Sequence, residues 1–375
     1  MAVLGLASVV SSFIKIRYLV DKAVIDNLVF RCHYRVTSAI LFLCCVVVTA
    51  NNLIGEPISC INDGSIPMHV INTFCWITYT YSIPGLLNKN VGTEVAAPGA
   101  GNDYGQEKRY HSYYQWVPFV LFLQGIMFYI PHWIWKNWEN GKVRIVTEAK
   151  SSSIFVGSFK THNGYSFGYF FCELLNFLNV ILNMFMVDKF LGGTFLKYGT
   201  EVIKFSNMQQ ENRTDPMIEI FPRLTKCTFH KYGPGGSLQN HDTLCLLALN
   251  ILNEKIYVFL WFWFYVLMGL SACTIIYSGI VIMLPTSREK IIKRRFRSDH
   301  NKMNIKELVR RLDIGDFLLV HLIGQNINVN SYSDIITDLC VGYLESPGET
   351  PSAPSTLEMQ TIYPEVEKFG KEEGC

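Results

Sequence analysis

The stretch YYQWVPFVLFLQGIMFYIPHWIW, residues 113–135, decides how the rest of the chain is read. It contains no Asp, Glu, Lys or Arg, and a helix needs roughly 20 mostly apolar residues to cross a bilayer. Tyrosine and tryptophan residues gather at both of its ends, as they do at the two interfaces of a membrane. Residues 113–135 are therefore predicted to form a membrane-spanning helix.

Two prolines occur in this predicted helix. Pro118 lies in the first turn, where a missing N–H group costs no hydrogen bond. Pro131 lies inside the helix, where it removes one backbone hydrogen bond and clashes with the previous turn, so we expect a kink there. Two roles stay open for Pro131: a hinge for gating, or a fixed kink that helps the helices to pack.

The composition agrees with a membrane protein. Of the 375 residues, 49% are hydrophobic and 17% are charged, which argues against a pair of soluble domains. The net charge of +2 indicates no polyanionic partner such as nucleic acid. The sequence has no internal repeat, no cofactor fingerprint and no histidine pair with metal-ligand spacing. We therefore expect no catalytic site, no cofactor and no bound metal.

Three further apolar stretches have the length of a membrane span. They cover residues 36–54, 167–187 and 256–285, and the last exceeds the bilayer thickness, so it should tilt or project. Four spans place both ends of the chain on one side of the membrane. Basic residues crowd the segments before the first span, between the second and third, and after the fourth, and the positive-inside rule places these segments in the cytoplasm.

One face of the first span carries small and polar side chains. Ser38, Cys45, Thr49 and Asn52 are separated by seven, four and three residues, so they share one side of a helix. A polar stripe on a membrane helix faces protein or water rather than lipid. Two interpretations stay open: the stripe lines an aqueous pore, or it lets helices pack closely.

An acidic residue, Glu173, lies within the third span near its cytoplasmic end. An ionisable group at membrane depth is costly and usually faces the interior of the helix bundle. We expect its side chain to reach the interface or to pair with a basic residue.

Each of the two segments assigned to the outside contains two cysteines, Cys60 and Cys75 in the first and Cys227 and Cys245 in the second. In an oxidising compartment they predict two disulfide bonds, with three possible pairings. Metal ligation is the alternative, but CxxC spacing is absent from the sequence. Asn212 begins the sequence Asn-Arg-Thr in the second outer segment, which makes it a candidate N-glycosylation site.

Residues 298–345 show helical patterning, and the chain from residue 346 onward is rich in proline and acidic residues, so we expect that tail to be disordered. The predicted division of the chain is a cytoplasmic N-terminal segment at 1–35, a first span at 36–54, an outer segment at 55–112, a second span at 113–135, a cytoplasmic loop at 136–166, a third span at 167–187, a second outer segment at 188–255, a fourth span at 256–285, a cytoplasmic helical domain at 286–345 and a tail at 346–375.

Three functions are open for such a chain: a large-pore channel subunit, a four-span adhesion or scaffold protein, and a membrane enzyme. The enzyme has the least support, because the histidines are scattered and no Ser/His/Asp order stands out. Tetraspanins carry a CCG triplet in their large loop and claudins a W-GLW-C-C pattern, and this chain has neither in its outer segments.

One pentapeptide resembles the signature of the innexins, the invertebrate gap-junction proteins: it consists of Tyr113, Tyr114, Gln115, Trp116 and Val117. The resemblance extends over nearly the whole chain up to residue 345. It includes DN and VFR at 26–27 and 29–31, IGEPISC at 54–60, NTFCWI at 72–77, FPRLTKC at 221–227, CLLALNILNEK at 245–255 and IGDF at 314–317. Within the family the chain resembles the insect innexin-three subtype, although its 136–166 loop is short. Connexins differ in having three cysteines per outer loop, and pannexins lack the YYQWV pentapeptide.

The resemblance implies a fold class: an all-α transmembrane subunit of four helices with a small disulfide-linked α+β extracellular domain and a helical cytoplasmic domain. It implies the pairings Cys60 with Cys245 and Cys75 with Cys227. It also implies that the N-terminal segment, beginning with Ala2 and Val3, narrows the pore and that the first span lines part of it.

The partners implied by the resemblance are copies of the same chain. Six to eight subunits form a ring in the plasma membrane at cell–cell junctions, either alone or mixed with other innexins. The ring contacts membrane lipids and docks with a second ring on the apposed cell, and ions and small metabolites pass through by diffusion.

Overall fold

The structure is a computed structural model that describes residues 23–62, 64, 66–102, 105–149, 162–206, 215–296 and 302–345. Within these residues the chain forms two compact units. The first contains residues 29–130 and 176–272, and the second contains residues 23–28, 131–175 and 273–345. Ala2, Val3, Asn212 and the tail from residue 346 lie outside the described residues.

In the described part of the chain, four helices are long and apolar enough to cross a membrane, which confirms the predicted number of spans. They are Leu28–Ile54, α5 (Val117–Glu139), α8 (Asn163–Phe190) and α11 (Ala248–Met283). Each continues past its predicted apolar stretch at one end or both. The reason is that a helix satisfies its own backbone hydrogen bonds and can continue where side chains are polar.

The first of these helices is not uniform. It consists of α2 (Leu28–Arg31), a π-helical segment η1 (Cys32–Thr37) and α3 (Ser38–Ile54). The hydroxyl of Thr37 donates a hydrogen bond of 2.9 Å to the carbonyl of Cys32, five residues earlier. Wide turns of this kind are rare in proteins, and those that occur are often found at functional sites.

Large apolar side chains form the helical core of the first unit. Phe128 of α5 stacks on Phe264 of α11 with 5.6 Å between ring centroids, and Leu41 of α3 is fully buried in the same cluster. Other side chains on the four long helices, such as Phe119 of α5 and Leu182 of α8, are more than half exposed. Exposed apolar faces of this kind fit helices that are surrounded by lipid or by other subunits.

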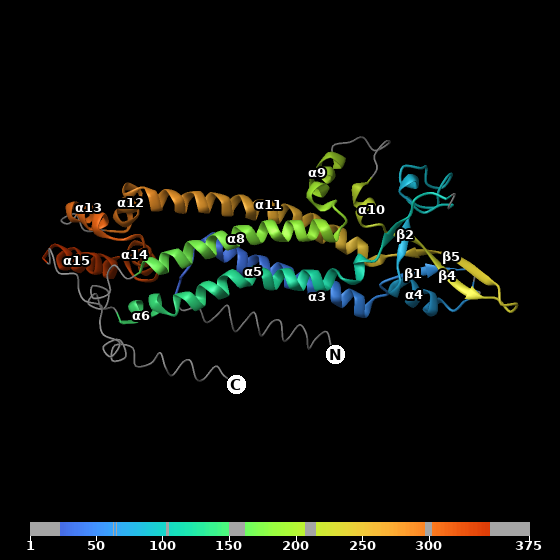
Figure 1. The fold of residues 1–375 in the computed structure, drawn as a ribbon, viewed down its shortest axis with the longest axis horizontal. Coiled ribbons are helices and arrows are strands. Elements are labelled where there is room, and N and C mark those ends of the chain that lie inside the picture. Colours follow the sequence, from blue (N-terminus) through green and yellow to red (C-terminus); the bar gives the residue numbers. More distant parts are fainter. Residues whose placement is uncertain are drawn as a thin grey trace, which may run out of the picture. The chain divides into compact units, whose positions relative to one another are not determined.

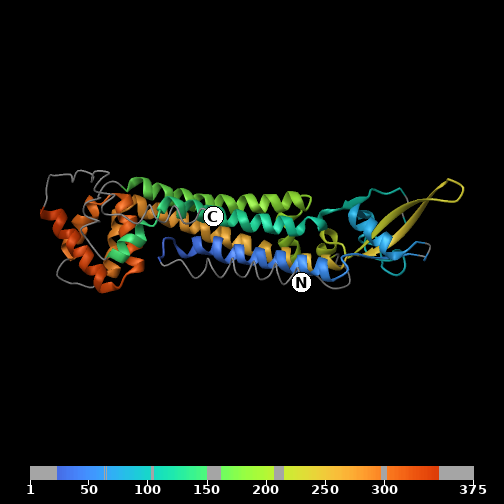
Figure 2. The ribbon, with the colours of Figure 1, turned by 90° about the horizontal axis from the view of Figure 1, so that it is seen from below.

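The two outer segments form one antiparallel sheet of five strands in the order β1-β5-β4-β2-β3. The strands are β1 (Ser59–Ile61), β2 (Thr80–Ser82), β3 (Arg109–His111), β4 (Leu224–Tyr232) and β5 (Leu238–Leu246). Strands β4 and β5 pair over their full lengths and form a hairpin that projects beyond the other outer strands (Figure 2).

Short helices accompany the outer sheet (Figure 1). They are α4 (Met68–Ile77), α9 (Phe195–Ser206) and α10 (Pro216–Ile220). Helices and a sheet joined by disulfide bonds confirm the predicted α+β outer domain.

The second unit contains a group of helices that follows the fourth span (Figure 1). They are α12 (Pro285–Arg295), α13 (Lys302–Arg311), α14 (Ile314–Asn326) and α15 (Val329–Glu345), which confirms the predicted helical domain. Pro285 occupies the first turn of α12, where proline is well tolerated. Part of the predicted 136–166 loop is also helical, as α6 (Lys142–Ala149).

Candidate functional site

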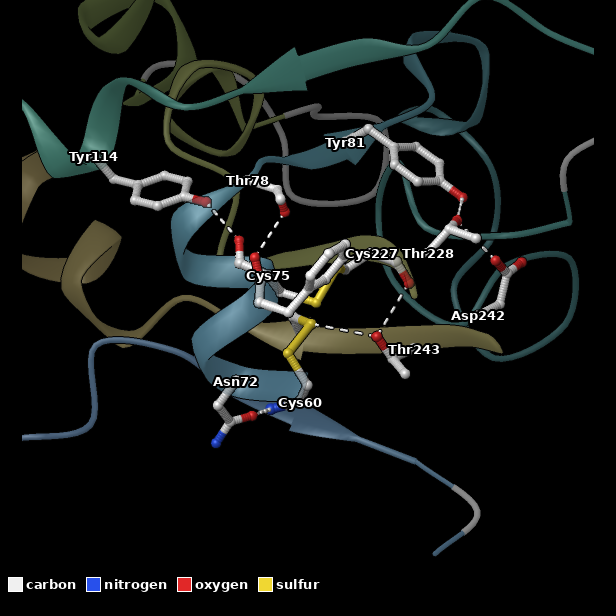
Figure 3. The surroundings of a disulfide bond; sticks show 12 residues. Cys60, Asn72, Cys75, Thr78, Tyr81, Tyr114, Cys227, Thr228, Asp242 and Thr243 are labelled. Atoms are coloured by element: carbon white, nitrogen blue, oxygen red, sulfur yellow. Dashed lines mark hydrogen bonds between the residues drawn. A yellow bond between two sulfur atoms is a disulfide. The ribbon is translucent and has the colours of Figure 1, made fainter. Parts of the chain in front are cut away.

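Two disulfide bonds join the first outer segment to the second (Figure 3). Cys60 is bonded to Cys245 and Cys75 to Cys227, with Cα–Cα distances of 3.9 and 6.0 Å. This is the pairing that the family resemblance implies. The sheet register explains one bond, because Cys60 of β1 lies directly opposite Cys245 of β5.

The bonding of the same cysteines decides between the two roles that the sequence leaves open, disulfide bonds or metal ligation. The sulfur atoms of Cys60, Cys75 and Cys245 lie within 4.8 Å of one another, and all three residues are buried. A zinc ion is bound by thiolate sulfur, which a disulfide does not offer. The arrangement is therefore a covalent link between two chain segments rather than a metal site.

The signature residues fasten both outer segments to the second span. Tyr113, Tyr114 and Gln115 form a 3₁₀ turn, η3 (Tyr113–Gln115), ahead of α5, whereas the sequence predicted a helix from residue 113; Val117 is the first residue of α5. The Tyr114 hydroxyl donates to the carbonyl of Cys75 at 3.1 Å (Figure 3). The Gln115 amide donates to the carbonyl of Trp76, and the Tyr113 hydroxyl donates to the carbonyl of Ile220 at 3.0 Å.

These three carbonyls lie in the last turns of α4 and α10. The last four carbonyls of a helix have no partner within the helix and must find one elsewhere. Tyrosine and glutamine suit this task because both are long and end in a hydrogen-bond donor. The two other signature residues differ: Val117 is fully buried, whereas Trp116 is 59% exposed.

An ion pair with a buried carboxylate forms a second attachment, between the residue before β4 and the fourth span. Both Arg223 and Glu254 fall in segments that resemble the family, but nothing in the sequence pattern predicted that they pair. The Arg223 Nη2 atom lies 2.9 Å from Glu254 Oε1 and 3.1 Å from Oε2, and the Glu254 side chain is only 1% exposed. The neighbouring Asn250 amide donates to the carbonyl of Pro222 at 2.7 Å. The signal available in the sequence was Glu254, a charged residue that follows a mostly apolar run just before the predicted fourth span.

The polar stripe of the first span lies partly against α5. The Ser38 hydroxyl donates to the carbonyl of Gly125 at 3.0 Å and is buried, and the Cys45 thiol donates to the carbonyl of Pro118 at 3.3 Å. These contacts support the close-packing interpretation at both positions. A Cβ atom at Gly125 would lie 2.8 Å from the ring of Phe42, which shows how closely the two helices approach.

The other half of the stripe makes no such contact with α5 in the described residues. The Thr49 hydroxyl donates to the carbonyl of Cys45 in its own helix at 2.7 Å. Asn52 is partly buried near the outer end of α3. Pro131 lies within α5, as the sequence predicts.

The expected partner of Glu173 is corrected by the structure. Its carboxylate accepts a hydrogen bond of 2.7 Å from the amide of Asn27 and another of 2.7 Å from the hydroxyl of Ser278. Both donors are neutral, and the side chain is buried. Neighbouring polar groups in the second unit therefore hold this carboxylate, where the sequence predicted a basic residue or the interface.

One titratable group is buried inside the outer sheet. His111 of β3 is 3% exposed, and its Nε2 atom lies 2.8 Å from the hydroxyl of Ser82 on β2. Burial, together with the positive charge of Arg109, lowers the pKa of His111 to about 4. This histidine is therefore neutral at physiological pH.

Comparison with known proteins places these features in a family. The family model named Innexin matches residues 26–343. The chain is 66% identical to Innexin inx3 of Drosophila melanogaster, over 99% of this chain and 98% of that protein. It is 43% identical to Innexin inx2 of Drosophila melanogaster over 85% and 92% of the two chains, and 41% identical to Innexin shaking-B of the same organism over 84% and 89%. The chain belongs to the innexin family, whose members form gap-junction channels.

Proposed function

We propose that several copies of this chain surround a water-filled pore and that rings in two apposed cells dock through their outer domains. The observation that carries this proposal is that two distant segments are fixed as one outer domain by two disulfides and by the contacts of Tyr113, Tyr114 and Arg223. A preformed domain favours docking, because ordering flexible loops on association costs affinity. Ions and small metabolites then pass by diffusion, and the chain has no catalytic role.

In this proposal six to eight subunits form the ring, either of this chain alone or together with other innexins. The ring lies in the plasma membrane at cell–cell junctions with both termini in the cytoplasm. The exposed apolar faces of the four spans support a ring embedded in a membrane, because such faces suit contact with lipids or neighbouring subunits.

The pore is lined by the N-terminal segment, which begins with Ala2 and Val3, and by the outer end of the first span. Thr49 and Asn52 are the stripe residues that remain for this role, since Ser38 is buried against α5. Pro131 acts as a hinge or as a fixed kink of α5. Asn212 carries a glycan in the second outer segment.

The experiment is junctional conductance between paired oocytes that express the chain. We expect current between the two cells, and we expect a membrane-impermeant reducing agent applied before pairing to abolish it. Cys273→Ser is the matched control, because Cys273 is exposed and outside both disulfides, so this variant should conduct and lose its current on reduction in the same way.

Two outcomes contradict the proposal. Pairs that adhere without passing current support the adhesion protein instead. Current that survives complete reduction of both disulfides would show that docking does not depend on the disulfide-linked outer domain. Single-particle imaging of the purified protein then gives the number of subunits and shows whether two rings stack.

A further inference from the structure

The four residues that precede the first span are each bound by another part of the second unit. Residues 24–27 are called the N-terminal junction here. Trp135 of α5 donates from its indole Nε1 to the carbonyl of Ile25 at 3.0 Å. The carboxylate of Asp26 lies 3.5 Å from Nδ1 of His132 on the same helix, and both side chains are buried.

The next residue of the junction reaches two more spans. Asn27 donates to Glu173 of α8, and that carboxylate also accepts a hydrogen bond from Ser278 of α11. Within the second unit, the start of the first span is thus hydrogen-bonded to the third span and, through Glu173, to the fourth. Asn27 is the last residue before α2 begins at Leu28, so its position sets where the first helix starts.

The first residue of the junction, Val24, is bound by the C-terminal helical domain. Asn326 is the last residue of α14, and its Oδ1 atom accepts a hydrogen bond from the Val24 N–H at 2.5 Å. Its Nδ2 atom donates to the Val24 carbonyl at 2.7 Å and to the carbonyl of Leu322 at 2.8 Å. One side chain thus pairs with both backbone groups of one residue. This pairing needs a donor and an acceptor on the same carbon, which asparagine has and aspartate lacks.

The other end of α14 is fixed against the start of the third span. The buried carboxylate of Asp316 lies 2.9 Å from Nδ1 of His162, the residue before α8. A Cβ atom at Gly315 would lie 2.0 Å from the carbonyl oxygen of His162, so only glycine fits there. Most of α14 between these two ends is buried, and its 13 residues span roughly 20 Å.

We propose that Asn326 is a positioning residue that couples the C-terminal helical domain, through α14, to the start of the first span. A displacement of α14 moves the backbone of Val24, and with it the N-terminal junction from which the first span begins. The inference rests on the proposed function, because the first span is taken to line the pore. It assigns to the C-terminal helical domain a direct influence on conduction.

The test compares Asn326→Ala and Asn326→Asp with the wild type in full-length hemichannels. Asn326→Ala removes both bonds to Val24. Asn326→Asp keeps the side-chain volume and the acceptor but loses the donor to the Val24 carbonyl. The matched control is Asn330→Ala, because Asn330 is exposed on the neighbouring α15.

Two readouts are measured on each variant at matched surface density. Hydrogen exchange of purified rings should be at least tenfold faster at the Val24 amide in Asn326→Ala, while peptides from α15 exchange as in the wild type. Hemichannel current should show an open probability changed at least threefold at fixed voltage in both Asn326 variants and unchanged in Asn330→Ala. A purely structural role would instead reduce surface density and speed exchange throughout the helical domain.

The inference is overturned if the Val24 amide exchanges at the wild-type rate in Asn326→Ala, or if both Asn326 variants conduct as the wild type does. If Asn326→Ala does not reach the surface, Asn326→Asp carries the test. Failure of the proposed function is distinguishable, because the wild type would then give no current while the exchange measurement would still report on the bond between α14 and Val24.

Discussion

Replacing Arg223 by methionine removes the charge partner of a buried carboxylate at the base of the outer domain. In the wild type, Nη2 and Nε of Arg223 approach the Glu254 carboxylate at distances from 2.9 to 3.3 Å. The Glu254 side chain is 1% exposed, and the Arg223 side chain is 40% exposed. Methionine keeps the length of the side chain and part of its apolar contact but has no N–H to donate.

The size of the effect follows from the charge that stays behind. Leaving one member of a buried ion pair without its partner costs about 3–5 kcal/mol. Lys255 also lies 3.1 Å from Glu254, but its side chain is 62% exposed, so it compensates only in part. We therefore expect a loss near the lower limit, about 3 kcal/mol, which is a factor of roughly 100 in the unfolding equilibrium. Arg223→Lys should lose about half as much, because it keeps the charge without the paired donors.

A double-mutant cycle measures this pairing directly. Glu254→Gln removes the buried charge while keeping the shape of the side chain, so the double variant Arg223→Met/Glu254→Gln should be more stable than Arg223→Met alone. The assay is thermal unfolding of the purified protein in detergent, with junctional conductance between paired oocytes as the functional readout. Equal or greater damage in the double variant would refute the argument, because the loss would then come from packing rather than from an unpaired charge.

Three further predictions concern other contacts of the first unit. Tyr114→Phe leaves a buried carbonyl at the end of α4 without its donor and should cost about 1–3 kcal/mol in thermal unfolding; a variant as stable as the wild type would contradict the capping role. Gly125→Ala presses a Cβ atom against Phe42 and should destabilise the protein by about 1–3 kcal/mol, whereas Gly269→Ala, in open space on α11, should not destabilise it in the same assay. The pKa of His111 is lowered from 6.5 to about 4 by folding, so between these pH values the unfolded chain binds a proton that the folded chain does not. The contribution of His111 to stability is therefore full above pH 6.5, and the free energy of unfolding falls by up to about 1.4 kcal/mol per pH unit as the pH drops toward 4. Melting temperatures at pH 7.5, 6 and 5 should show this loss in the wild type and a smaller one in His111→Gln.

The membrane spans could be predicted from the sequence because a bilayer imposes one strong demand, about 20 apolar residues in a row. The helix ends could not, since the helices continue on their own hydrogen bonds into polar segments such as Leu28–Arg31. The number of outer cysteines predicted two disulfide bonds, but the residues alone left three pairings open. Only the register of β1 against β5, which brings Cys60 opposite Cys245, makes one of these pairings geometrically clear.

The polar contacts between residues far apart in the chain could not be predicted from the sequence, for a different reason. Asn27 and Glu173 are 146 residues apart, and Val24 and Asn326 are 302 apart. No periodicity or spacing links residues at such separations, because their contact depends on how separate helices pack. The π-helical turn that ends at Thr37 also gave no signal, since any residue type can occupy a widened turn.

The position of Tyr113, Tyr114 and Gln115 ahead of α5 has a mechanical consequence. The two disulfides hold the outer segments to each other, whereas the donors of Tyr113, Tyr114 and Gln115 hold the ends of α4 and α10 to the residues just before the second span. The two kinds of attachment are chemically independent, because a reducing agent cleaves sulfur–sulfur bonds and leaves hydrogen bonds to backbone carbonyls intact. Reduction should therefore leave the outer segments joined only by the pairing of β1 with β5 and of β2 with β4, while each segment stays attached near the second span. Loss of docking under reduction would then report on the shape of the outer domain rather than on its detachment from the membrane helices.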